Sequence, residues 1–176
     1  MNTLKKGLIV AVAVFFAMSL QAQTIDTQKS AANFTVKNMR WMTVEGNFTG
    51  MKGDIKFDEA DLANSNFNVC VDAATVNTDN NARDKHLRNE DFFDVDKYST
   101  ICFVSTSISQ KGSGFVTKGQ LTMHGVTKEV SIPFTYSDGT FKGNLKISRY
   151  DYKVGESTGT FMVSEDVNLE IIAVTN

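Results

Sequence analysis

Apolar residues in this chain recur at every second position over most of its length. Between residues 31 and 37, for example, Ala32, Phe34 and Val36 alternate with other, mostly polar side chains. The same spacing recurs in segments 44–48, 53–58, 66–73, 101–105, 115–123, 130–136, 141–147 and 167–173. Such alternation is typical of strands that bury one face. The sequence therefore predicts an all-β fold of about eight or nine short antiparallel strands, arranged as a barrel or a sandwich.

Turn signals separate these segments and add detail to the predicted sheet. The Asp138-Gly139 pair predicts a tight hairpin, and His124-Gly125 marks another turn. Pro133 lies inside a strand, out of phase with the apolar face, and predicts an edge or a bulge because proline donates no backbone hydrogen bond. The strongly patterned last strand is expected to pair with the first and so remove both sheet edges.

One segment, 78–94, breaks the alternation because it is polar, charged and poor in β-branched residues. Asp79 or Asn80 is placed to cap a short helix that runs through Leu87. Phe92 and Phe93 follow and are expected to point inward. The predicted fold is therefore a run of strands, one short helical crossover, and a second run of strands.

Residues 1–22 have the three-part layout of a secretory signal peptide. Lys5 and Lys6 precede an uncharged apolar run over residues 7–18, and Ala22 offers a small residue for cleavage before Gln23. The run is shorter than the roughly 20 residues that a membrane-spanning helix needs. We expect cleavage near Gln23, which leaves residues 23–176 as one domain in the periplasm or outside the cell.

The charge of the chain argues against nucleic-acid binding, and its two cysteines leave one disulfide possible. The net charge is −2 and no arginine-rich stretch is present, so no nucleic-acid partner is predicted. No other apolar segment of the sequence is long enough to span a membrane either. Cys70 and Cys102 both lie on the outward parity of their strands, and export would take them into an oxidising compartment. They can form one disulfide if the strand register brings them together.

The two histidines are the only candidates for general acid–base chemistry or metal binding by imidazole. His86 lies among acidic residues, but only Glu90 stands four residues away, so a solvated helix with Arg83 or Arg88 paired to Asp84 or Asp91 is favoured over a metal site. His124 fits a turn role. No nucleophile elbow, phosphate-binding loop or zinc-protease motif is present. No catalytic residue, metal or cofactor is therefore predicted.

A series of short elements, in order along the chain, is similar to the YceI-like family. The elements are residues 44–48 (VEGNF), 53–58 (GDIKFD), Thr78, 83–87 (RDKHL), 91–94 (DFFD), 101–103 (ICF), 119–128 (GQLTMHGVTK) and 147–152 (ISRYDY). The resemblance implies an exported, lipocalin-like antiparallel β-barrel that holds a polyisoprenoid or quinone-like chain in an elongated apolar tunnel. The chain departs from the family at Asn38-Met39, where many members have His-Leu, which affects the expected contact with a ligand head group.

The inward parity supplies the residues that would line this tunnel. On pattern alone an ordinary packed core is favoured, because a barrel of about eight strands can be filled by its own side chains or hold one small ligand. The resemblance favours the tunnel. The predicted apolar lining is Phe34, Phe48, Phe57, Phe67, Val69, Phe103, Leu121, Met123, Phe134, Phe141 and Leu145.

The expected function is that of a non-enzymatic, exported carrier of polyisoprenoid or other long apolar lipids. Burial alone supplies affinity for such a tail, at about 0.8 kcal/mol per CH₂ group. Two alternatives stay open: an enzyme that acts on isoprenoid lipids at the barrel mouth, and an envelope stress or interaction module in which the barrel is only a scaffold. The sequence also leaves a homodimer open.

Overall fold

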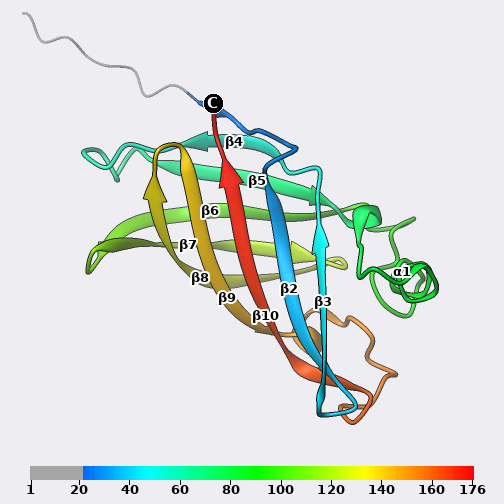
Figure 1. The fold of residues 1–176 in the computed structure, drawn as a ribbon. Coiled ribbons are helices and arrows are strands. Elements are labelled where there is room, and N and C mark those ends of the chain that lie inside the picture. Colours follow the sequence, from blue (N-terminus) through cyan, green and yellow to red (C-terminus); the bar gives the residue numbers. More distant parts are fainter. Residues whose placement is uncertain (1–21) are drawn as a thin grey trace, which may run out of the picture.

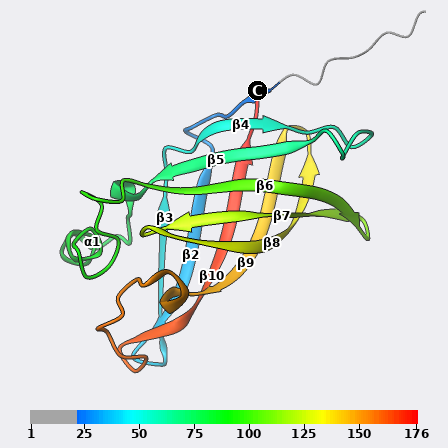
Figure 2. The same cartoon turned by 180° about the vertical axis from the view of Figure 1, so that it is seen from behind.

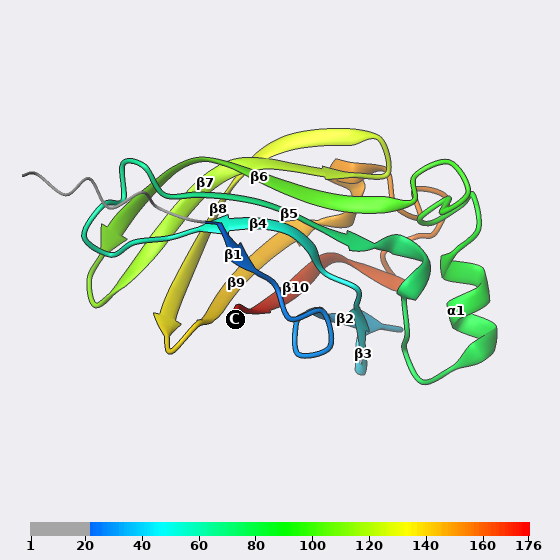
Figure 3. The same ribbon diagram turned by 90° about the horizontal axis from the view of Figure 1, so that it is seen from above.

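A computed structural model of the chain describes residues 22–176, so the predicted signal peptide lies outside the described residues except for Ala22. A single antiparallel sheet curls into a half-barrel (Figures 1 and 3). Its strands are β1 (Gln23–Thr24), β2 (Ala31–Asn38), β3 (Met42–Phe48), β4 (Lys52–Lys56), β5 (Asn66–Asp72), β6 (Thr100–Lys111), β7 (Gly114–Met123), β8 (Val126–Ser137), β9 (Thr140–Ser148) and β10 (Val163–Val174). The helices are η1 (Ala73–Thr75), α1 (Asn81–Leu87) and η2 (Arg149–Tyr152).

The all-β prediction is confirmed, and each of the nine alternating segments forms a strand. The spatial order is β1-β4-β5-β6-β7-β8-β9-β10-β2-β3, so neighbouring strands are mostly neighbours in sequence. The tenth strand, β1, has only two residues, which is too short for an alternation to show. None of the helices in the described part of the chain is long and apolar enough to cross a membrane.

The predicted pairing of the last strand with the first is confirmed. β10 pairs with β9 on one side and with β2 on the other (Figure 2). Leu169 lies opposite Phe34 and Ile171 opposite Ala32, so the inward faces of the two strands are in phase. A one-residue slip would turn every one of these side chains outward, which is why the alternation also fixes the register.

This pairing does not remove both edges, and that part of the prediction is wrong. β1 and β3 end the sheet, and each edge is covered by a local link instead. On the β3 edge, Asn47 and Asn77 exchange backbone hydrogen bonds of 2.9 and 3.0 Å. On the β1 edge, Ile25 forms a bridge with Thr175 at the end of β10. Each link occupies backbone groups that an open edge would offer to another chain.

Pro133 stands where the ladder between β8 and β9 stops. The two strands pair only over Phe134–Ser137 and Thr140–Gly143, around the predicted Asp138-Gly139 turn. The first two thirds of β8 therefore have a free side, as the edge prediction for Pro133 requires. η2 packs against both strands in this gap. The Lys128 ammonium contacts the Asp151 carboxylate there, and His124 Nδ1 lies 3.2 Å from the Tyr152 carbonyl oxygen.

The helical crossover between β5 and β6 is present as predicted, in the form of η1 and α1. Of the two candidate caps, Asn80 is the one used: its Oδ1 accepts a hydrogen bond of 3.0 Å from the Arg83 backbone N–H. After the helix, Phe92 is buried and Phe93 packs against the core, so both point inward. The crossover thus lays two aromatic rings over one end of the half-barrel.

At the other end an aromatic cluster fills the interior. Phe57 lies at its centre, with ring centroids of five neighbours at 5.0–6.1 Å. Those neighbours are Phe67, Phe115, Phe134, Tyr136 and Phe141. Tilted and edge-on contacts of this kind add about 0.5–1.5 kcal/mol per pair to the burial itself. This end is an ordinary packed core.

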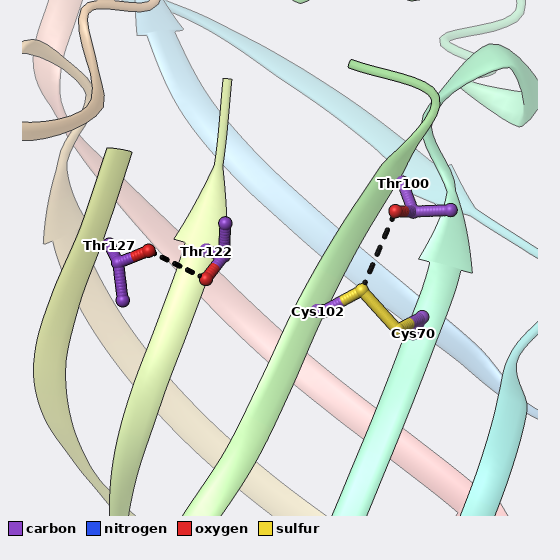
Figure 4. The surroundings of a disulfide bond; sticks show 5 residues. All are labelled: Cys70, Thr100, Cys102, Thr122 and Thr127. Atoms are coloured by element: carbon purple, nitrogen blue, oxygen red, sulfur yellow. Dashed lines mark hydrogen bonds between the residues drawn. A yellow bond between two sulfur atoms is a disulfide. The ribbon is translucent and has the colours of Figure 1, made fainter. Parts of the chain in front are cut away.

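Cys70 on β5 and Cys102 on β6 lie directly opposite each other and form a disulfide (Figure 4). The structure therefore resolves the register question that the sequence left open. The neighbouring strands carry a similar non-covalent pair on the same side of the sheet: the Thr122 and Thr127 hydroxyls, 2.8 Å apart (Figure 4). The covalent link closes a loop, with a sequence separation of 32, that contains the whole helical crossover.

Removing the disulfide should lower the free energy of unfolding by roughly 3–4 kcal/mol, because the bridge restricts the unfolded chain over that loop. Denaturant unfolding of Cys70→Ser/Cys102→Ser against the wild type measures this. Thr122→Ala serves as the control and should change stability by less than about 0.5 kcal/mol. Equal stability of the double variant and the wild type would contradict the expectation, and two free thiols in the unreduced, unfolded protein would exclude the bridge.

Candidate ligand-binding site

Three cavities lie in a row along the inner face of the sheet, away from the aromatic cluster. We call them the inner, middle and mouth cavities, with volumes of about 110, 80 and 270 Å³. Phe48, Met123 and Leu169 line both the inner and the middle cavity. The middle and mouth cavities also share walls, formed by Phe34, Val36, Leu87, Phe92 and Val163. The three therefore follow one path from the centre of the half-barrel to α1.

The inner cavity lies behind the disulfide and is bounded by residues of eight strands, β2, β3 and β5–β10. Six of the predicted lining residues contribute to it: Phe48, Val69, Phe103, Leu121, Met123 and Leu145. The remaining walls are Ala32, Met51, Val71, Ile101, Ile132, Leu169, Ile171 and the two cysteines. Such a surface can bind a ligand only by burying apolar area.

The middle cavity connects this interior to the crossover. Predicted residues Phe34, Phe48 and Met123 line it, and Phe92 and Phe93 close it from the helical side. The Phe34 ring lies directly over the backbone of Gly46 on β3. A Cβ atom at Gly46 would stand 2.4 Å from Phe34 Cζ, so only glycine allows the ring to take this place.

Four predicted lining residues, Phe57, Phe67, Phe134 and Phe141, line none of these three cavities. They belong to the aromatic cluster at the opposite end. Alternation tells which face of the sheet a side chain occupies but not how far along the barrel it lies, so the sequence could not separate these residues from those that line the cavities. The inward face is thus divided into a packed end and a hollow end.

Polar side chains in the lining are concentrated at the mouth cavity; the exception is Arg149, which lines the middle cavity. Asn38, Thr78, Arg83, His86 and Thr158 lie at the mouth beside apolar residues from β2, α1 and the loop before β10. These polar groups come from three separate parts of the chain, so they surround the opening of a mainly apolar path. This is the arrangement of a site that takes an apolar tail and leaves its polar end at the rim.

Thr78, Arg83 and Asp84 form a closed hydrogen-bond network at the start of α1. The buried Asp84 carboxylate accepts from the Thr78 backbone N–H at 2.9 Å and from the Thr78 hydroxyl. Arg83 donates from Nε to Thr78 Oγ1 and from a terminal nitrogen to the Thr78 carbonyl, both at 2.8 Å. The network satisfies the buried carboxylate. It also uses the Thr78 hydroxyl both as a donor and as an acceptor.

His86 has a partner that the sequence did not suggest. Its Nε2 lies 2.5 Å from Asp91 Oδ2, and both side chains are substantially exposed. The expected ion pairs of Arg83 or Arg88 are wrong: Arg88 instead donates to the carbonyl oxygens of Ala74 and Val76, each at 2.7 Å. Among residues 22–176, no group of three or more His, Cys, Asp or Glu side chains is arranged to hold a metal ion.

Asn38 carries the one unsatisfied polar atom in the lining of the three cavities. Its Oδ1 is buried and has no hydrogen-bond partner among the described residues. A buried acceptor of this kind costs about 1–3 kcal/mol unless a partner reaches it. Asn38 is also the position at which the sequence departs from the family pattern, and the structure places that departure at the opening of the cavity path.

Arg149, which the sequence resemblance included without assigning a role, lines the middle cavity. Its buried guanidinium reaches carbonyl oxygens of the loop before β10 and of the first residues of that strand, with bonds of 2.9 Å to Val154 and 3.1 Å to Val163 and Ser164. It contacts Gly155 and Thr158 in the same way. This loop supplies residues to the mouth cavity, so Arg149 positions one of its walls.

Tyr152, at the end of η2, is almost fully buried, and its hydroxyl has no partner among the described residues. Burial, helped by the negative charge of Asp151, raises the pKa of Tyr152 to about 12. The phenol is therefore neutral at physiological pH. Its ring fills the gap between β8 and β9 rather than offering a titrating group to the cavities.

Fold and site together define a class: a curled antiparallel sheet around an apolar path that opens at a polar rim. The YceI-like domain model matches residues 23–175. A UPF0312 protein of Vibrio campbellii is 32% identical over 93% of this chain and 94% of its own length. A UPF0312 protein of Vibrio vulnificus is 37% identical over 74% of this chain and 71% of its own length. The chain belongs to the YceI-like family.

Solved structures agree with this assignment. BcnA of Burkholderia cenocepacia superimposes with a TM-score of 0.80 at 28% identity, covering 86% of this chain and 99% of BcnA. The YCEI protein of Campylobacter jejuni gives 0.70 at 30% identity, covering 80% and 89%. A polyisoprenoid binding domain from Saccharophagus degradans gives 0.67 over 88% of this chain and 98% of that domain, and at 17% identity shows the common fold.

Replacing Arg149 by methionine should loosen the loop that forms one wall of the mouth. The change leaves several carbonyl oxygens without a donor, so we expect a loss of at least about 2 kcal/mol in the free energy of unfolding, with faster proteolysis within residues 153–163. Lys128→Met is the matched control, because its exposed ion pair with Asp151 should contribute less than about 1 kcal/mol. Wild-type stability and proteolysis in Arg149→Met would contradict the positioning role.

Proposed function

We propose that this protein is an exported carrier of a long apolar lipid of the polyisoprenoid class. The tail occupies the inner, middle and mouth cavities, and the polar end of the lipid stays at the rim formed by β2, α1 and the loop before β10. Affinity comes from burial of the tail, and the rim supplies orientation. The protein binds its lipid without changing it chemically.

The observation that carries this proposal is that the three cavities are adjacent and share lining residues. Taken together, their volumes fall in the range of roughly 300–1,000 Å³ that ligand pockets occupy. The path that they follow is narrow, and apart from Arg149 its walls are apolar until the mouth. A flexible chain of isoprene units matches this shape better than a compact ligand, and gains about 0.8 kcal/mol for each buried CH₂-sized group.

The relatives support the ligand class. The Saccharophagus degradans domain is named for polyisoprenoid binding, and it shares the fold that creates the path in this chain. Membership of the YceI-like family extends the likeness over residues 23–175. We assign the same class of lipid here because the hollow half of the barrel offers that lipid an apolar surface of suitable length.

Asn38 gives the proposal a head-group preference. The buried Oδ1 requires a hydrogen-bond donor, and a hydroxyl at the end of the lipid would supply one. Arg83, the cationic group that lines the same cavity, already donates to Thr78. The rim therefore favours a lipid that ends in an alcohol or a phenol over one that needs several donors for a phosphate.

The His86–Asp91 pair favours a second candidate, an enzyme that acts on the lipid head at the mouth, because the histidine lines that cavity. Catalysis would need a nucleophile in reach of His86. Thr78 and Thr158 carry the hydroxyl groups of the same lining. The Thr78 hydroxyl is already used by its hydrogen bonds to Asp84 and Arg83, and among the described residues the side-chain partner of His86 is Asp91, not either threonine. We therefore favour binding over catalysis.

Export is part of the proposal, and N-terminal sequencing of the protein from the cell envelope tests it. The first strand begins at Gln23, and the disulfide suits an oxidising compartment. The mature chain should therefore begin at or near Gln23, because the apolar run before it is too short to remain as an anchor. A soluble mature form that retains Met1 would contradict export by cleavage.

Ligand retention tests the carrier function. Purified wild type should keep a polyprenyl compound, and Leu121→Asp should lose it because a lone charge in the inner cavity costs several kcal/mol. Val104→Asp is the matched control: Val104 is exposed and lies one residue from Phe103, on the outward parity of β6. It should retain the lipid, and so should His86→Ala. Native mass spectrometry measures occupancy in all four proteins.

A further substitution at the same position keeps the test decisive if Leu121→Asp does not fold. Leu121→Trp narrows the inner cavity without adding charge and should shorten or displace the bound tail. A folded wild type that binds no polyprenyl compound when one is supplied would disprove the carrier function. Loss of binding in His86→Ala alone, with the fold intact, would instead support a specific polar site at the mouth.

A further inference from the structure

Four exposed apolar side chains gather at one corner of the molecule. We call Trp41, Met42, Phe161 and Met162 the mouth patch; they are 67%, 51%, 49% and 48% exposed. Within the described part of the chain only one other large apolar residue, Val104, is exposed to this degree. The patch joins the turn between β2 and β3 to the segment before β10, which meet at the lower end in Figure 1 and again in Figure 2.

Contacts between the turn and the segment before β10 hold the two parts of the patch together. The Trp41 and Phe161 rings meet edge to face with centroids 6.4 Å apart. The Met39 backbone N–H donates to the Met162 carbonyl oxygen at 3.0 Å, which fixes the turn against the loop. The Arg40 guanidinium lies 5.7 Å from the centroid of the Phe161 ring. A fixed, solvent-facing apolar patch of this kind marks an interaction site.

The backbone at the tip of the turn is held in a costly conformation. Met39 and Arg40 have φ angles of 48° and 68°, in the left-handed region that favours glycine and asparagine. Each such residue costs of order 1 kcal/mol. Strain of this kind persists where the surrounding contacts impose it, and here the turn presents Trp41 and Met42 to solvent.

The mouth patch adjoins the opening of the cavity path. Met162 belongs to the patch and also lines the mouth cavity. Val163, which follows Met162 in sequence, and Asn38, three residues before Trp41, line the same cavity. A lipid that leaves the mouth cavity therefore emerges beside the exposed rings.

Local charge gives the patch a sign opposite to that of the chain. The whole sequence carries a net charge of −2. Segment 37–43 nevertheless contains Lys37 and Arg40 and no acidic residue, and segment 157–163 contains no charged residue. Aromatic side chains together with cations are the composition that lies at the interface of a bilayer, where anionic head groups attract each basic residue.

We propose that the mouth patch docks the protein on a bilayer that contains anionic phospholipid. Trp41, Met42, Phe161 and Met162 enter the interfacial region, and Lys37 and Arg40 face the phospholipid head groups. The mouth cavity then opens toward the membrane, so that the apolar tail moves between bilayer and cavity with little exposure to water. This inference rests on the proposed carrier function, whose lipid must be collected from or delivered to a membrane.

Trp41 is the only tryptophan in the chain and reports on its own environment. When vesicles of phosphatidylcholine and phosphatidylglycerol are added, the fluorescence emission of Trp41 should shift to shorter wavelength. Lipids brominated on the acyl chains should quench this fluorescence. Phe161→Asp should weaken vesicle partitioning by about tenfold or more. The substitution removes a ring that the bilayer would bury and adds a negative charge that the anionic head groups would repel. Arg40→Gln should weaken binding to phosphatidylglycerol vesicles but not to pure phosphatidylcholine.

Val104→Asp is the control, since it removes the other exposed large apolar side chain at a distance from the mouth and should partition like the wild type. Absence of any Trp41 shift or quenching in the wild type would overturn the docking. The docking would also be overturned if the wild type formed dimers without vesicles and Phe161→Asp abolished them, because a second copy of the chain would then cover the patch. Lipid retention, measured separately, should persist in Phe161→Asp. A wild type that binds vesicles but holds no polyprenyl compound would refute the carrier function while leaving the docking intact.

Discussion

The pairing of β10 with β2 is the constraint on which the rest of the structure depends. These strands come from the two ends of the described chain, and their ladder turns what would be an open sheet into a half-barrel with an inside. Its register is fixed because each inward residue of β10 opposes an inward residue of β2. Once the sheet curls, large apolar side chains from β2 to β10 converge on one space. Their sizes then decide whether that space is filled or left hollow.

The division of the interior follows from where the largest side chains fall along the strands. Phe57, immediately after β4, contacts five other aromatic rings, and together they fill one end. Toward α1, smaller side chains such as Val69, Leu121 and Leu145 leave the inner cavity. At the rim the chain changes from apolar to polar groups. A site for a lipid needs these three zones in this order: a closed end, an apolar path, and a polar opening.

Sequence reasoning could predict the strands, the Asn80 cap and the inward parity, because each depends on local chemistry and a short-range period. It could not predict depth along the barrel, so Phe34 and Phe134 were indistinguishable although one lines a cavity and the other packs against rings. It also could not anticipate Arg149 as a loop anchor, since the five carbonyl groups that it reaches follow it by 5–15 residues, in the loop before β10 and at the start of that strand. The ISRYDY element of residues 147–152 contains Arg149 and was the available signal, but it does not tell which groups the side chain reaches.

The short ladder between β8 and β9 divides the wall mechanically. Six strands, β1 and β4–β8, lie on one side of it, and four, β9, β10, β2 and β3, lie on the other. β8 and β9 pair only over Phe134–Ser137 and Thr140–Gly143, at the packed end, while η2 packs against the remainder of both strands. The two groups are also linked at the Ile25–Thr175 and Asn47–Asn77 bridges. Regions held by few backbone hydrogen bonds open at a lower free energy than the whole fold. The seam that η2 covers is therefore where we expect the wall of the half-barrel to open first.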